Sequence, residues 1–290
     1  MLRLGCLRLV ALLALVFVLG CGPREVTNSD VDSAPSGALL AADQRLRSGD
    51  RDGAGEAFEA LAAAYPDSWG AARGLQDVRR MSMQPAQFEA LYSAAQEAAP
   101  ESALAWYLLG RARIERFSES LAAFETAQRL APRSPWPPAG IAYLHWASGN
   151  MYLCLKAYEA GIERMPRSAR LRLLIGNQLL NLRLVVHAQR HLEFAQRLAP
   201  EDPSIVAALG KVYIELGRYP AGRALLESAL QLDATQSDVA MSLASVYLHD
   251  REPQRAEGLY RRALEGGLPA DEALYGAIRA AKIVEQGASR

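Results

Sequence analysis

Prolines recur at nearly constant spacing through most of this chain, and this spacing constrains the fold more than any other feature. They are Pro66, Pro100, Pro132, Pro166 and Pro200. The successive intervals are 34, 32, 34 and 34 residues; a further 34 residues reach Ala234, and Pro269 follows 35 residues later. A proline ends the helix before it, so the period predicts repeats of two short helices. Each repeat is too small to bury its apolar face alone, so neighbouring repeats must stack.

Other sequence marks keep the same register. Trp106, Leu109 and Gly110 form a Trp-x-x-Leu-Gly pattern in an expected first helix, and second helices pair small residues with an aromatic, as Cys154 and Tyr158 do. Small residues at fixed offsets let helices approach closely, and the large aromatic fills the space opposite. The period and these marks together resemble the tetratricopeptide repeat.

The first twenty residues resemble a secretory signal. Residues 1–8 carry two arginines and no acidic residue, and residues 9–19 are an unbroken apolar run. Such a run is too short to span a bilayer as a permanent anchor. Val18, Leu19 and Gly20 precede Cys21 in a pattern similar to the lipobox of bacterial lipoproteins. The resemblance implies that Cys21 is acylated, becomes the new N-terminus and holds the protein on a membrane.

The resemblance also implies a location. Gly22 stands where an aspartate favours retention in the inner membrane, so we expect an outer-membrane lipoprotein facing the periplasm, with inner-membrane anchoring as the alternative. Cleavage would remove Arg3 and Arg8, which changes the balance from 32 basic and 32 acidic side chains to 30 and 32. This near-neutral balance excludes a strongly basic nucleic-acid binder. Cys154 is then left without a partner for an intrachain disulfide.

The chain as a whole resembles tetratricopeptide-repeat lipoproteins, and we divide it accordingly. Residues 1–20 are the signal peptide, and residues 21–37 are the acylated cysteine and a polar, disordered tether. Residues 38–286 form the repeat domain, in which about seven repeats cover residues 35–269 and a cap helix follows at 271–286. The expected fold class is all-α, a right-handed superhelical solenoid of helix-turn-helix repeats with a C-terminal cap helix.

The sequence contains no arrangement typical of catalysis, and we expect no enzyme activity, no cofactor and no bound metal. His187 and His191 lie four residues apart, so they share a helix face, but Ala188 replaces the glutamate of the zincin motif and no third ligand is placed. An enzyme or metal carrier built on these two histidines is the alternative. Cys154 stands where the repeat needs a small buried residue, which predicts a core position.

The family resemblance implies a concave groove lined by first helices. Carrying the register over gives seven candidate groove residues: Tyr107, Arg111, Tyr143, Trp146, Arg170, Asn177 and Lys211. Tyrosine, tryptophan and arginine suit a surface that holds extended peptides or partner helices. The packing of some aromatics between helices is the alternative. Leu173, Ala208 and Ser242 occupy places where carboxylate-clamp members carry other residues, so a clamp of that kind is not expected.

These features predict a non-enzymatic scaffold that binds envelope-assembly proteins in its groove and is anchored through Cys21. A narrower alternative is a pilotin-like assembly factor for a secretin or a type IV pilus or secretion machine. Adaptors for murein hydrolases or proteases, and factors in polysaccharide export, fit the sequence equally well. The sequence leaves the oligomeric state open.

Overall fold

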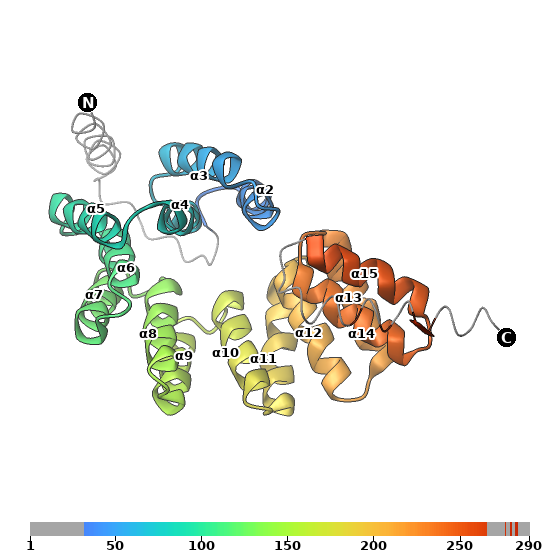
Figure 1. Ribbon diagram of the computed structural model, residues 1–290. Coiled ribbons are helices and arrows are strands. Elements are labelled where there is room, and N and C mark those ends of the chain that lie inside the picture. Colours follow the sequence, from blue (N-terminus) through green and yellow to red (C-terminus); the bar gives the residue numbers. More distant parts are fainter. Residues whose placement is uncertain (1–31, 266–275, 277–278, 280–281, 284–290) are drawn as a thin grey trace. The chain divides into compact units, whose positions relative to one another are not determined.

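The computed structural model describes residues 32–265, 276, 279 and 282–283, and within them the regular secondary structure is entirely helical (Figure 1). Fourteen helices with defined bounds follow one another along this part of the chain. They are α2 (Ser36–Arg47), α3 (Arg51–Ala64), α4 (Trp69–Ser82), α5 (Pro85–Ala98), α6 (Ala103–Ala112), α7 (Phe117–Leu130), α8 (Trp136–Ala147), α9 (Met151–Arg164), α10 (Ala169–Asn181), α11 (Val185–Leu198), α12 (Pro203–Glu215), α13 (Tyr219–Leu232), α14 (Ser237–His249) and α15 (Pro253–Glu265).

These helices follow one another as seven consecutive pairs along the described chain, α2 with α3 through α14 with α15, which we number repeats 1 to 7. The predicted all-α fold and the seven repeats are confirmed. The second helices of repeats 1 to 5 each end two residues before a proline, as α9 ends at Arg164 before Pro166. A residue that precedes proline is disfavoured in the helical conformation, so the helix stops there. The second helix of repeat 6 ends two residues before Ala234 without that help.

The first helices begin at one repeat position that carries a short polar residue. The hydroxyl oxygens of Ser68, Ser102 and Ser168 accept hydrogen bonds from backbone N–H groups three residues later, at 3.0, 3.2 and 3.1 Å. Asp202 does the same for α12. These side chains satisfy N–H groups that have no partner within the helix.

The tight turns inside several repeats require left-handed backbone conformation. Gly149 and Gly217 have φ angles of 78° and 73°, and the residues at the same place in repeats 5 and 7 are Arg183 at 60° and Arg251 at 62°. Glycine adopts this conformation without strain, whereas a residue with a Cβ atom does not. Repeats 5 and 7 therefore keep the turn geometry without the residue that suits it best.

Contacts divide the described chain into two compact parts. The first contains residues up to Leu46 together with Arg51–Leu171, and the second contains Arg47–Asp50 and the residues from Arg172 onward. The core of the first part includes Phe58, Phe88, Tyr92, Tyr107 and Phe124. The core of the second part includes Leu226, Val239, Leu243, Tyr247 and Tyr260.

Residues 32–37 were expected in the disordered tether, but the structure ties them to repeat 2. The Asp32 carboxylate accepts hydrogen bonds from the Ser68 hydroxyl and from the backbone N–H of Gly70, the latter at 2.5 Å. Ala34 is buried, and α2 already begins at Ser36. The short polar side chains of this segment, which predicted a disordered tether, form capping and turn contacts instead.

Other sequence expectations fall largely outside the described residues. The signal peptide, Cys21 and most of the expected cap helix at 271–286 lie there, although Gly276, Arg279, Lys282 and Ile283 are helical. Gly276 is buried against the Tyr260 ring. Among the helices that are described, none has the length and apolar character needed to cross a membrane.

Candidate protein-binding faces

Repeats 2 to 5 place an arginine–tryptophan cluster on their first helices. We use this name for Arg73 of α4, Arg111 of α6, Trp136 of α8 and Arg170 of α10, all in the first compact part. The guanidinium carbon of Arg73 lies 4.0 Å from the centre of the Trp136 ring, and that of Arg170 lies 4.9 Å from it. Both distances are within the range of cation–π attraction. Two positive charges therefore converge on one indole.

Tyr107 packs beside this cluster and contacts three aromatic rings. Its ring centre lies 5.2 Å from that of Trp69, 5.5 Å from that of Phe124 and 6.5 Å from that of Trp136. Tyr107 was expected to line the groove, but its side chain is only 3% exposed, so this expectation needs correction. The neighbouring aromatic rings bury it, and Trp136 packs against it.

Arg111 extends the cluster along α6. Its Nη2 donates to Oδ1 of Asp77 at 2.6 Å, and its carbonyl oxygen accepts from Nη2 of Arg80 at 2.7 Å. Nη1 of Arg111 and Nε of Arg73 are buried, and within the described structure they have no hydrogen-bond partner. Guanidinium donors left in this state carry a desolvation cost that an anion would relieve.

Tyr143 and Trp146 lie three residues apart on α8 and are exposed. Their exposed fractions are 50% and 41%, and their ring centres are 5.5 Å apart. Residues three apart on a helix share a face, so the two rings form one aromatic patch. We call it the α8 aromatic pair. Large aromatic side chains left in water by the fold are typical of binding surfaces.

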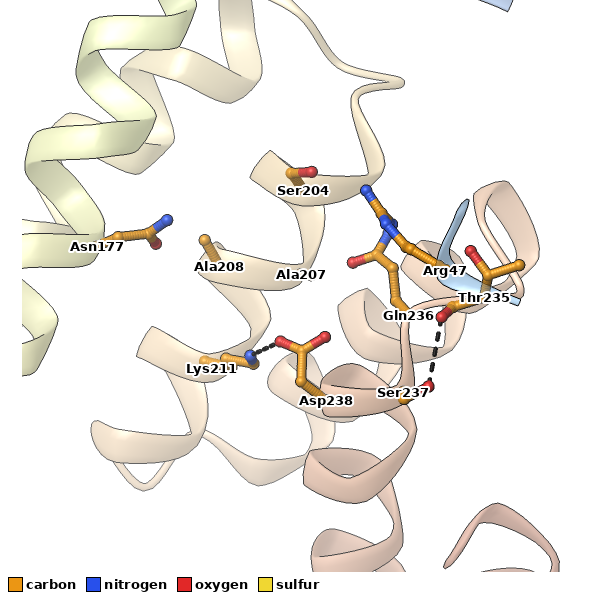
Figure 2. Close-up of a pocket in the computed structure, with 10 residues that line it drawn as sticks. All are labelled: Arg47, Asn177, Ser204, Ala207, Ala208, Lys211, Thr235, Gln236, Ser237 and Asp238. Carbon is orange, nitrogen blue, oxygen red and sulfur yellow. Dashed lines mark hydrogen bonds and ion pairs between the residues drawn. The ribbon is translucent and has the colours of Figure 1, made fainter. Parts of the chain in front are cut away.

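The second compact part has a polar pocket of about 440 Å³ (Figure 2). Its lining residues are Arg47, Asn177, Ser204, Ala207, Ala208, Lys211, Thr235, Gln236, Ser237 and Asp238. Nζ of Lys211 lies 2.6 Å from Oδ2 of Asp238, and Figure 2 shows the Asn177 side chain reaching toward the same space from α10. The pocket therefore collects the polar residues that α10, α12 and α14 carry on one side.

Gln236 occupies the position at which other first helices have a capping serine or aspartate. Its side chain makes no capping hydrogen bond to α14 and lines the pocket instead. It is 7% exposed, and its Nε2 has no hydrogen-bond partner within the described structure. Gln236 therefore leaves α14 without a side-chain cap and places an amide N–H donor at the pocket wall.

The seven candidate groove residues do not form one site. Arg111 and Arg170 belong to the arginine–tryptophan cluster, whereas Asn177 and Lys211 line the pocket of the second compact part. Tyr143 and Trp146 form the α8 aromatic pair and belong to neither of these two sets.

Sequence analysis missed Gln236 of the pocket. It also missed three residues that the repeat register places: Arg73, Asp77 and Asp238. Arg73 and Asp77 precede Tyr107 and Arg111 by one period of 34 residues, and Asp238 follows Ser204 by the same interval. Carrying the register into repeats 2 and 7 would have found them.

Burial shifts the pKa values of His191 and Cys154, two titratable side chains singled out in the sequence. Burial lowers the pKa of His191, and the nearby Arg172 and His187 lower it further. Burial raises the pKa of the Cys154 thiol to about 11, so it is protonated near neutral pH and is a poor nucleophile. Among the described residues, no group of three or more His, Cys, Asp or Glu side chains is placed to hold a metal ion.

Comparison with known proteins agrees with this architecture. A family model described as a tetratricopeptide repeat matches residues 186–246. The anaphase-promoting complex subunit CDC16 of Saccharomyces cerevisiae is 21% identical over 178 residues, which cover 58% of this chain and 21% of that subunit. The chain thus spans about a fifth of the length of this curated relative.

Solved structures share the fold at low sequence identity. PilF of Pseudomonas aeruginosa matches with a TM-score of 0.57 and 24% identity, covering 64% of this chain and 86% of that one. Yeast Tom70 matches with a TM-score of 0.64 and 13% identity, covering 95% and 70%. A chain of the APC/C hetero-tetramer Cut9–Hcn1 matches with a TM-score of 0.58 and 17% identity, covering 95% and 52%.

The chain contains tetratricopeptide repeats. The family model matches residues 186–246, and the described helices on both sides of that segment follow the same two-helix pattern. Proteins of this fold typically act as non-catalytic interaction scaffolds and bind protein partners.

Proposed function

We propose that this protein is a non-enzymatic scaffold that is anchored to a membrane through acylated Cys21 and faces the periplasm. It binds envelope-assembly partners, as extended peptides or helices, on the faces carried by its first helices. The sequence before Cys21 supports the anchor, because an apolar run of signal-peptide length ends at a lipobox-like pattern. The repeat fold supports the scaffold role.

The observation that carries the binding role is the exposure of the α8 aromatic pair. Both rings lie on a first helix and contact each other, yet about half of each side chain faces solvent. Burying such rings against a partner releases water from apolar surface at little cost in side-chain entropy. The pair therefore has the properties of an interface centre.

A crosslinking pull-down from the native envelope tests the binding role. The variant is Tyr143→Ala/Trp146→Ala, and the matched control is Tyr152→Ala, since Tyr152 is 73% exposed but lies on α9, the second helix of the same repeat. We expect partners to be lost from the double variant and kept by the control. Equal recovery from all three proteins would remove the α8 aromatic pair from the binding surface.

The anchor is tested separately. Metabolic labelling with an alkyne fatty acid should label the wild-type protein and leave Cys21→Ser unlabelled, while Cys154→Ser keeps the label. Membrane fractionation of the same strains should move only Cys21→Ser to the soluble fraction. Labelling that survives the Cys21 substitution would contradict the proposed anchor.

A narrower form of the proposal is a pilotin-like assembly factor for a secretin or a type IV pilus or secretion machine. The lipobox-like sequence and the solenoid shared with Pseudomonas aeruginosa PilF favour it. The likeness concerns the fold alone, so the test must be functional. A deletion strain should contain fewer secretin multimers, and an unchanged multimer count would discard this form.

A further inference from the structure

We propose that the pocket of the second compact part is a binding site for a neutral saccharide. This inference goes beyond the proposed scaffold function and does not depend on it. The pocket presents side-chain amides, hydroxyl groups and charged groups to one enclosed space (Figure 2). The ligand would be held through its hydroxyl groups, as one or two sugar rings, at a place that does not include the α8 aromatic pair.

The charged side chains at the pocket already pair with groups of opposite sign. Nη1 of Arg47 lies 2.6 Å from Oδ2 of Asp233. Nζ of Lys211 lies 2.6 Å from Oδ2 of Asp238. A charged ligand would compete with these ion pairs, whereas a neutral ligand leaves them intact. A paired ammonium group still has N–H donors and a paired carboxylate still has lone pairs, so hydroxyl groups, which both donate and accept, suit this wall.

Two amide side chains face the pocket from different helices. Gln236 is 7% exposed, and its Nε2 donor has no hydrogen-bond partner within the described structure. An unsatisfied buried donor costs free energy, which an acceptor placed in the pocket would recover. Asn177 is exposed on α10, and Figure 2 shows its amide reaching toward the same space. Each amide offers one acceptor and one donor group, which match two neighbouring hydroxyl groups of a sugar ring.

The size and lining of the pocket favour a saccharide over a peptide. The volume of about 440 Å³ lies toward the small end of the range for small-ligand sites, roughly 300–1,000 Å³. Two of its ten lining residues, Ala207 and Ala208, are apolar. Peptides are anchored mainly through aromatic and aliphatic side chains, which need larger apolar surfaces than two methyl groups. The C–H face of a sugar ring needs no more than the two alanines supply.

The test is binding of the purified full-length protein to a printed array of neutral, anionic and amino disaccharides, followed by calorimetry with the most strongly bound sugar. Wild type should bind neutral disaccharides in preference to the charged ones. Gln236→Met removes the Nε2 donor, keeps a side chain of similar length, and should weaken binding at least about tenfold. Gln231→Met is the matched control, because Gln231 is exposed on α13 of the same compact part, and it should bind as wild type does.

Asn177→Leu keeps the test decisive if Gln236→Met folds poorly, because Asn177 is exposed and its replacement leaves the core unchanged. It should weaken binding by a similar factor. The proposal is overturned if wild type binds no saccharide, if it prefers charged sugars, or if either variant keeps wild-type affinity. Random peptides printed on the same array test the competing occupant, and peptide binding that both variants lose overturns the proposal as well.

The scaffold function is judged separately. The pull-down with Tyr143→Ala/Trp146→Ala reports on protein partners at the α8 aromatic pair and leaves the pocket unchanged. Loss of partners in that variant together with no saccharide binding removes the saccharide site and keeps the scaffold. Saccharide binding that depends on Gln236 and Asn177, together with unchanged partners, has the opposite meaning.

Discussion

A Cβ atom added to Gly110 would lie 2.8 Å from Cδ1 of Phe124. The same ring meets Gly140 of the next repeat, where an added Cβ atom would lie 2.7 Å from Cε1. One phenylalanine on α7 thus fills the space that two glycines leave on α6 and α8. The close approach of helices in neighbouring repeats depends on these absent side chains.

Gly110→Ala and Gly140→Ala should each lower the free energy of unfolding by about 1–3 kcal/mol, because the buried Phe124 ring has no free space to move into. Urea titration followed by circular dichroism measures the change. Gly258→Ala on α15 is the control, since nothing lies within 4 Å of its added Cβ atom. It should be neutral or stabilising by up to about 1 kcal/mol. Equal effects at all three sites would contradict the packing argument.

Arg251→Gly should raise the free energy of unfolding by about 1 kcal/mol, because Arg251 holds a φ angle of 62° that glycine adopts without strain. Gly217→Ala changes the same turn position one repeat earlier, where φ is 73°. It should lower stability by a similar amount, and the opposite signs are the signature of a backbone effect. Thermal melting of both variants measures it.

The Cys154 thiol should resist modification in the folded protein. Its pKa is raised by burial to about 11, and the side chain is fully covered. In a Cys6→Ser/Cys21→Ser background, Cys154 is the one cysteine of the chain. Ellman's reagent at about pH 8 should report no thiol in the native state and one in guanidinium chloride. Rapid reaction of the native protein would show that repeat 4 opens locally.

Protonation of His191 should weaken the second compact part. Burial, Arg172 and His187 keep its folded-state pKa below the ordinary value of 6.5. Below that value the unfolded chain binds more protons than the folded chain, so stability is present above about pH 6.5 and is lost as pH falls through the folded-state pKa. The drop in urea midpoint between neutral and mildly acidic pH should shrink in His191→Gln. His249→Gln, at an exposed position, should keep it.

Much of the fold could be predicted because the repeat depends on residue types that strongly affect local backbone conformation and helix packing. Proline positions gave the ends of second helices, and the small and aromatic residues gave the packing register. The predicted tether boundary was wrong because Asp32 and Ser68 are 36 residues apart in sequence and meet only in the folded chain.

The candidate faces were harder to predict. Repeat register shows which residues share a side of the first helices, but it does not show how much of each side chain its neighbours cover. Tyr107 illustrates this difference: it was expected to line the groove, and the structure packs three other aromatic rings against it. Gln236 was not predicted either, because a failed helix cap is visible only once the backbone is placed.

Gln76 stands in repeat 2 at the helix position that holds glycine in repeats 3, 5 and 6, and its fully buried amide donates from Nε2 to the Leu108 carbonyl oxygen at 2.8 Å. In a solenoid, stability depends on each neighbour interface as well as on each repeat. This hydrogen bond makes one such interface chemically unlike the others. Repeats 2 and 3 are therefore not interchangeable, because the contact between them includes a buried amide that repeats 3, 5 and 6 lack at this position.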